Sequence, residues 1–115
     1  MKMLYHKSMT PEKWKKFSFY EQMANIGSEV FRAMNWRKKN QEYSRLAIER
    51  ALELLDLTLE TSYPSGPRLK ELARLREALA DYFYFDNEYG SSDKSWENYF
   101  HVFNYAARNP TANER

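Results

Sequence analysis

Cysteine is absent from the 115 residues, which excludes disulfides, thiolate metal sites and cysteine nucleophiles. Glycine and proline are scarce, with three and four residues, while aromatic residues make up 17% of the chain, so the composition predicts a packed domain. No apolar run approaches the roughly 20 residues of a membrane span, and Met1–Met9 contains no signal peptide pattern. We expect one cytoplasmic domain, residues 1–115, without membrane contact.

Histidine is almost as scarce, and this limits the possible chemistry. His6 and His101 are the only two, so the Glu-x-x-His pairs of di-iron bundles are missing. The stretch Glu53–Asp56 supplies only half of the carboxylate set with which helical nucleotide pyrophosphatases hold Mg²⁺. There is no glycine-rich phosphate loop and no Gly-x-Ser-x-Gly motif. The sequence therefore predicts a protein that is not an enzyme and has no catalytic residues, metal or cofactor.

Four segments show the apolar period of an α-helix. Thr10 and Pro11 are typical of a helix start, Pro67 suits the first position of a later helix, and Asn109 precedes a proline that ends the last one. The predicted helices run from Pro11 to the turn at 37–39, from about Asn40 to Thr61, from Pro67 to about Phe85, and from a cap at Ser91, Ser92 or Asp93 to Asn109. Their short connections predict an all-α, up-down-up-down four-helix bundle, with loose ends at 1–9 and 111–115.

Gly27 lies in the middle of the apolar stripe of the first predicted helix. A glycine inside a helix costs about 1 kcal/mol relative to alanine. We therefore expect a second helix to cross close to this position.

The second predicted helix is apolar over well over half of its circumference. One core contact does not use so much surface. Either several helices of the same chain surround it, or its second apolar flank contacts another copy in a homo-oligomer. For the second alternative, the predicted oligomer interface consists of Ile48, Leu52, Leu55 and Leu59.

Two arginines start from apolar faces of the predicted helices, Arg50 among leucines of the second and Arg76 among those of the third. A guanidinium in such a place needs a carboxylate partner unless its long stem reaches the solvent. The candidate partners on facing helices are Glu21, Glu29 and Asp86.

The charge is unevenly distributed along the chain. Residues 1–39 hold nine Lys and Arg against three Glu, whereas the remainder holds nine against thirteen Asp and Glu. In an up-down bundle one end gathers six cations, called here the basic end: Lys13, Lys15, Lys16, Arg68, Lys70 and Arg108.

Aromatic residues accompany these cations, since Trp14, Phe17 and Tyr20 lie near the first three. Cations and exposed rings together are typical of proteins that bind RNA or DNA. An acidic protein partner is the alternative. At the opposite end, Arg37 and its two lysine neighbours are expected beside Asp86, Glu88 and Asp93, which oppose a polyanion.

Three stretches, Glu21–Arg32, Arg50–Thr58 and Asp86–Ser91, resemble an uncharacterised family of short microbial four-helix proteins, over about residues 14–108. In size and architecture the chain is also similar to the ribosomal intervening-sequence proteins and to the accessory variability proteins of retroelements. Asn25-Ile26-Gly27 is similar to the Asn-Ile-Ala-Glu-Gly of the former. The resemblance implies a self-associating accessory protein that binds nucleic acid or a reverse transcriptase, and it supplies no site residues.

Overall fold

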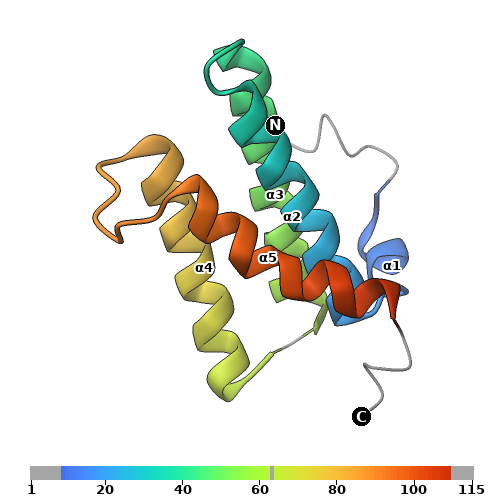
Figure 1. Cartoon of the computed structure of the whole chain (residues 1–115). Helices are drawn as coiled ribbons and strands as arrows, with labels where there is room; N and C mark the ends of the chain where they lie inside the picture. Colours follow the sequence, from blue (N-terminus) through green and yellow to red (C-terminus); the bar gives the residue numbers. More distant parts are fainter. Residues whose placement is uncertain (1–8, 63, 110–115) are drawn as a thin grey trace.

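The computed structural model describes residues 9–62 and 64–109 and shows only helices there (Figure 1). The helices are α1 (Pro11–Trp14), α2 (Phe19–Trp36), α3 (Gln41–Ser62), α4 (Gly66–Tyr84) and α5 (Asp93–Arg108). The all-α class is confirmed. The predicted loose ends and His6 lie outside the described residues, apart from Met9, which packs half-buried against the core.

The first predicted helix is not continuous. Thr10 caps α1 as predicted, because its Oγ1 accepts a hydrogen bond from the Lys13 amide at 3.2 Å. The chain leaves the helix after Trp14 and restarts at Ser18, whose hydroxyl accepts from the Glu21 amide while the Glu21 carboxylate accepts from the Ser18 amide. This reciprocal capping box begins a new helix, so the apolar stripe does not correspond to one long helix. With 18 residues, α2 is about 27 Å long, whereas one continuous helix from Pro11 to the turn at 37–39 would be about 40 Å long.

The regular up-down-up-down bundle is not confirmed. Helices α2 and α3 lie side by side and antiparallel, but α5 crosses diagonally over α2 (Figure 1). The crossing occurs at Gly27, where an added Cβ would lie 2.8 Å from ring carbons of Phe100 and 2.9 Å from its Cβ. The close crossing predicted from Gly27 is thus confirmed.

Helix α3 packs against three other helices, α1, α2 and α4. Ile48 and Leu55 are 1% and 0% exposed, and Leu52 and Leu59 pack partly buried against the same core. The first of the two alternatives for this apolar helix therefore holds. The predicted oligomer interface is wrong for Ile48 and Leu55, since the fold of a single chain already buries both side chains.

Arg50 has one of its predicted partners. Its Nη1 lies 3.7 Å from Oε2 of Glu29, a residue that is only 9% exposed. The other Glu29 oxygen accepts from Arg32 at 2.8 Å. Two guanidinium groups therefore surround one buried carboxylate, which compensates the cost of removing it from water.

Arg76 follows the second of the two alternatives, because its guanidinium reaches the solvent, and the buried ion pair with Glu21, Glu29 or Asp86 is not formed. Its guanidinium binds both carboxylate oxygens of Asp56 at 2.7 and 3.1 Å in a solvent-exposed pair between α4 and α3. Of the other proposed partners, Glu21 belongs to the α2 cap and Asp86 is exposed. The long side chain of Arg76 extends across the apolar face of its helix, so that its charged group lies at the solvent-exposed edge.

Candidate nucleic-acid interface

Three lysines of the basic end lie on α1 and the turn that follows it, and a buried tryptophan holds this segment in place. Trp14 is 1% exposed, and its Nε1 donates to Thr58 Oγ1 of α3 at 3.0 Å. The buried side chain of Gln22 in α2 donates to the Trp14 carbonyl at 2.9 Å. The exposed lysines 13, 15 and 16 are therefore displayed on a segment fixed to two helices. The predicted stacking role of Trp14 is wrong, because its ring is inside the core.

Arg68 connects two helix starts. Its guanidinium carbon lies 3.8 Å from the centroid of the Phe19 ring, which joins the first turn of α4 to the first turn of α2. Phe19 and Tyr20 in turn contact the Phe103 ring of α5, with centroids 6.0 and 6.3 Å apart. These contacts gather the starts of α2 and α4 and the second half of α5 at one end, and Arg108 is in the last turn of α5.

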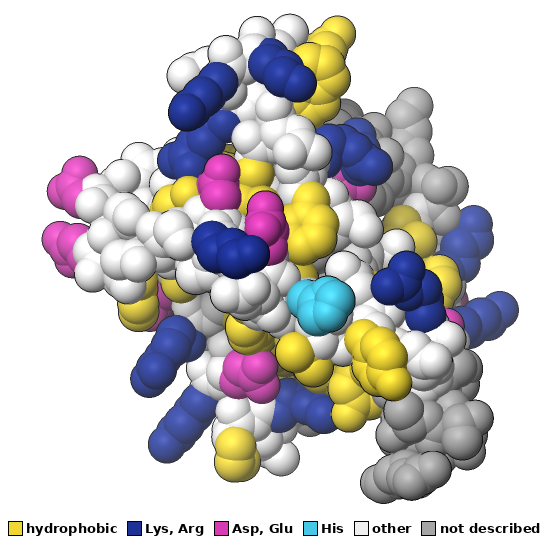
Figure 2. All heavy atoms as spheres, viewed as in Figure 1, with side chains coloured by type: hydrophobic (Ala, Val, Ile, Leu, Met, Phe, Trp, Pro, Cys, Tyr) yellow, Lys and Arg dark blue, Asp and Glu magenta, His cyan; other side chains and the backbone are white. Residues whose placement is uncertain are grey.

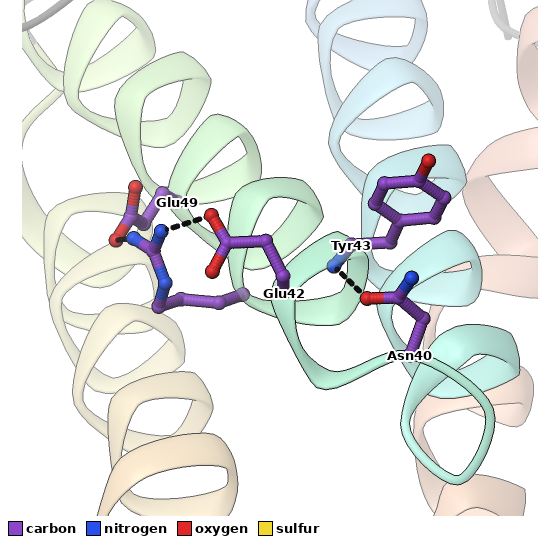
Figure 3. Close-up of polar contacts among 5 residues, drawn as sticks. Asn40, Glu42, Tyr43 and Glu49 are labelled. Atoms are coloured by element: carbon purple, nitrogen blue, oxygen red, sulfur yellow. Dashed lines mark hydrogen bonds and ion pairs between the residues drawn. The ribbon is translucent and has the colours of Figure 1, made fainter.

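Four arginines on the helix flanks are paired with carboxylates. On the outer face of α3, Arg45 bridges Glu42 and Glu49 with two 2.6 Å bonds, beside Asn40, whose side chain accepts from the Tyr43 amide (Figure 3). Arginines 32, 50 and 76 are also paired with carboxylates. By contrast, lysines 15, 16 and 70 and Arg108 form no ion pair with any described residue, and the same holds for Arg74 and for lysines 38, 39 and 94.

Figure 2 shows how the charges lie on one face of the molecule. Lys and Arg side chains occur in separate groups over the α2–α3 turn, the start of α4 and the region of α1, and others lie nearer its centre, interspersed with acidic side chains. This face has no continuous basic patch.

At the opposite end, Arg37 is used inside the fold. It donates to the Tyr82 carbonyl at 2.7 Å, and its guanidinium lies over the rings of Tyr82 and Phe83, at 4.5 and 4.7 Å from their centroids. The Tyr82 hydroxyl donates to Asp93 at 2.6 Å. Arg37 is therefore less available to a polyanion than its formal charge indicates.

A groove of about 520 Å³ lies between α4 and α5. Its lining combines cationic, acidic, aromatic and apolar side chains: Pro67, Lys70, Glu71, Arg74, Leu75, Ala78, Tyr89, Ser91, Trp96 and Tyr99. Trp96 is 6% exposed, and its buried Nε1 has no hydrogen-bond partner among the described residues. An unpaired buried donor costs about 1–3 kcal/mol. The periodicity places Trp96 and Tyr99 on an inward face and gives no indication of the groove.

One wall of the groove depends on a buried carboxylate that the sequence patterns do not single out. Asp81 is 9% exposed, and its two oxygens accept from the amides of Glu88 and Tyr89 at 2.9 and 3.0 Å. It thereby fixes the loop between α4 and α5. A negative charge in the last turn of a helix is unfavourable unless hydrogen-bond donors compensate it. The position of Asp81 in the last turn of α4 is therefore the signal that could have identified this residue in the sequence.

The Tyr99 hydroxyl, on the other wall, predicts a pH dependence of stability. Burial, followed by its 2.8 Å hydrogen bond to Glu71, raises the pKa of Tyr99 well above its usual value. Above pH about 10 the unfolded chain loses this proton while the folded chain keeps it. The Tyr99 hydroxyl therefore makes its full contribution to the free energy of unfolding below that pH, and this contribution falls as the pH rises further.

Above pH 10, the free energy of unfolding of the Tyr99→Phe variant is expected to fall less steeply with pH than that of the unmodified protein. The two slopes should differ by up to about 1.4 kcal/mol per pH unit, measured by urea unfolding at several pH values. Tyr105→Phe, at an exposed position of the same helix, is the control for the loss of a tyrosine hydroxyl. Equal slopes for Tyr99→Phe and the unmodified protein would contradict the assignment.

In residues 9–62 and 64–109, no three His, Asp or Glu side chains gather closely enough to hold a metal ion. None of the described helices combines the length and the apolar character needed to traverse a bilayer. Comparisons with models of known protein families, with curated proteins and with solved structures found no match to this chain.

Proposed function

We propose that this protein is a non-enzymatic accessory protein that binds nucleic acid through its basic end. The observation that carries the proposal is that the exposed lysines 13, 15 and 16 lie beside the exposed Phe17 ring on a segment that Trp14 and Gln22 fix to two helices. Arginines 32, 45, 50 and 76 are compensated by carboxylates of the protein, whereas lysines 15, 16 and 70 and Arg108 have no such partner among the described residues. Cations without an internal partner are free to replace the counterions of a phosphate backbone.

The aromatic residues of this end add a second contribution. Phe17, beside Trp14 on the turn after α1, is 37% exposed, and Tyr20 is half-buried at the start of α2. Bases of a single strand stack on such rings with little sequence preference. Phe17 and Tyr20 therefore take over the stacking role for which Trp14 is too deeply buried. This favours a single strand over a duplex, whose bases are already stacked.

A salt titration tests the proposal. Fluorescence anisotropy of labelled 20-nucleotide RNA and DNA single strands gives the association constant at increasing NaCl. Each cation that contacts a phosphate contributes about −0.7 to the log–log slope for a single strand, so five contacts give roughly −3.5. Absence of binding at low salt, or a slope near zero, contradicts the proposal. Binding of a polyglutamate peptide without binding of either nucleic acid would instead favour an acidic protein partner.

A further inference from the structure

The loop between α4 and α5 begins with Phe85, which is 74% exposed and is the most exposed large hydrophobic residue of the described chain. Its neighbour Tyr84 is 44% exposed, and the two rings meet edge to face with centroids 6.5 Å apart. Figure 1 shows the loop projecting from the molecule, away from α2 and α3. Projecting aromatic side chains of this kind are typical of contacts with another protein surface.

Two side chains hold this loop in one shape. Both carboxylate oxygens of Asp81 accept hydrogen bonds from backbone amides of the loop, at 2.9 and 3.0 Å. Asn87, whose φ of 55° is in the left-handed region, accepts from the Ser91 amide at 2.8 Å and donates to the Ser91 carbonyl at 2.9 Å. Phe85 is therefore displayed on a preorganised loop, so binding to it costs little entropy in ordering the loop.

The loop is acidic, whereas the α4 wall of the α4–α5 groove is basic. The loop carboxylates, Asp86 and Glu88, are exposed and form no ion pair with any described residue. The groove cations, Lys70 and Arg74, are also exposed and lack an ion pair within the described part of the chain. The groove is further lined by buried apolar side chains: Leu75, Ala78 and Trp96. Phe85 does not line the groove of its own chain. Loop and groove are thus complementary in charge and in apolar character.

The spacing along α4 allows two copies of the chain to exchange these contacts. The α4 residues Pro67, Lys70, Arg74 and Ala78 of the groove wall recur every three or four residues and lie on one side of the helix. Phe85, directly after α4, continues the same phase. Lys70 and Phe85 are about 22 Å apart along the helix axis. A twofold axis perpendicular to α4 therefore places the loop of each copy beside the basic wall of the other, in a closed, self-complementary contact.

We propose that two copies of this chain associate about such a twofold axis, each inserting Phe85 into the α4–α5 groove of the other. The loop carboxylates of each copy then face the groove cations of its partner. The groove volume of about 520 Å³ is sufficient for an aromatic side chain. A second copy is favoured over an unrelated protein because the chain itself supplies the aromatic ring and the complementary charges. The contact needs no nucleic acid and does not depend on the proposed function.

Sedimentation velocity of the full-length protein without nucleic acid, from about 1 μM to about 1 mM, is expected to show a monomer–dimer equilibrium. Phe85→Ala should reduce the association constant about 30-fold or more, because each dimer loses both aromatic side chains from its centre. The control Tyr105→Ala removes a ring that is 56% exposed and lies outside the groove, and leaves the constant unchanged. Equal losses in the two variants overturn the proposal. So does a chain that stays monomeric to about 1 mM, and the groove is then left to another protein.

Reversal of charge tests the pairing of loop and groove. Changing Lys70 and Arg74 to Glu gives a variant with an acidic groove and an acidic loop, and changing Asp86 and Glu88 to Lys makes both basic. Each variant alone should associate about 100-fold more weakly, because like charges then meet at both contacts. An equimolar mixture of the two should form a heterodimer, since each groove again meets a loop of opposite charge.

The control for net charge changes Lys15 and Lys16 to Glu, which are exposed and lie outside the groove. This variant carries the same change in net charge as the variant with the acidic groove, and it should associate as the unmodified protein does. Circular dichroism verifies that every variant is folded. A mixture of the two folded charge-reversed variants that remains monomeric overturns the proposal, and so does an equal loss of association in the control.

Discussion

Simultaneous replacement of Lys13, Lys15 and Lys16 by Glu is expected to reduce affinity for a single-stranded 20-mer by about 100-fold or more. Each change removes an attraction of about 1 kcal/mol between an exposed cation and a phosphate and adds a repulsion of the same order, reduced by salt. The turn itself should survive, because its anchors are the buried Trp14 and Gln22. Anisotropy at constant ionic strength measures the loss, and circular dichroism verifies the fold.

The matched control changes Lys38, Lys39 and Lys94 to Glu. These lysines are exposed, lie near the opposite end of the molecule, and give the same change in net charge. Affinity is expected to fall no more than several-fold, through the long-range field alone. Arg37 is left unchanged because it binds the Tyr82 carbonyl and has a structural role. A greater loss in the control than in the triple variant of the α1 segment would disprove the location of the interface.

Gly27→Val is expected to lower the free energy of unfolding by about 3 kcal/mol. Its Cβ would lie 2.8 Å from ring carbons of Phe100 and 2.9 Å from the Phe100 Cβ, which cannot move without moving the α5 backbone. Phe100 is fully buried, so the ring has no free volume in which to relax. Such a loss is a large share of the 5–15 kcal/mol that stabilises a typical domain. Urea unfolding measures it.

Ser28→Val is the control for Gly27→Val. Ser28 is the next residue of α2 and is exposed, so this variant introduces the same β-branched side chain without a neighbour to strike. Its free energy of unfolding should remain within about 0.5 kcal/mol of the original. If the two valine variants are equally stable, the crossing at Gly27 is looser than the structure shows.

Local signals in the sequence are sufficient to predict most helix ends. Thr10 caps α1 and Ser92 caps α5 because a short side-chain oxygen satisfies a free amide nearby in the sequence. The break between α1 and α2 is equally local, since Ser18 and Glu21 form a capping box. The prediction of one long helix weighted the apolar stripe more heavily than this motif.

Contacts between helices depend on quantities that no single helix determines. The predicted pair between Arg50 and Glu29 forms, yet Arg76 binds Asp56 in place of the three candidates, because the rotation of α4 relative to α3 decides which carboxylate is in reach. The groove depends on the angle at which α5 crosses α2. Periodicity correctly turns Trp96 and Tyr99 inward but does not determine the distance between α4 and α5.

Tyrosine–carboxylate hydrogen bonds connect α4 to the elements that follow it. Tyr99 donates to Glu71, Tyr82 to Asp93, and Tyr89 to Glu77. Each bond contains one charge instead of two, so dissolved ions weaken it far less than they weaken a lysine–phosphate contact. If the proposed interface binds a polyanion, a rise in ionic strength would thus weaken that contact and leave these tyrosine–carboxylate hydrogen bonds intact, so the released protein would remain folded.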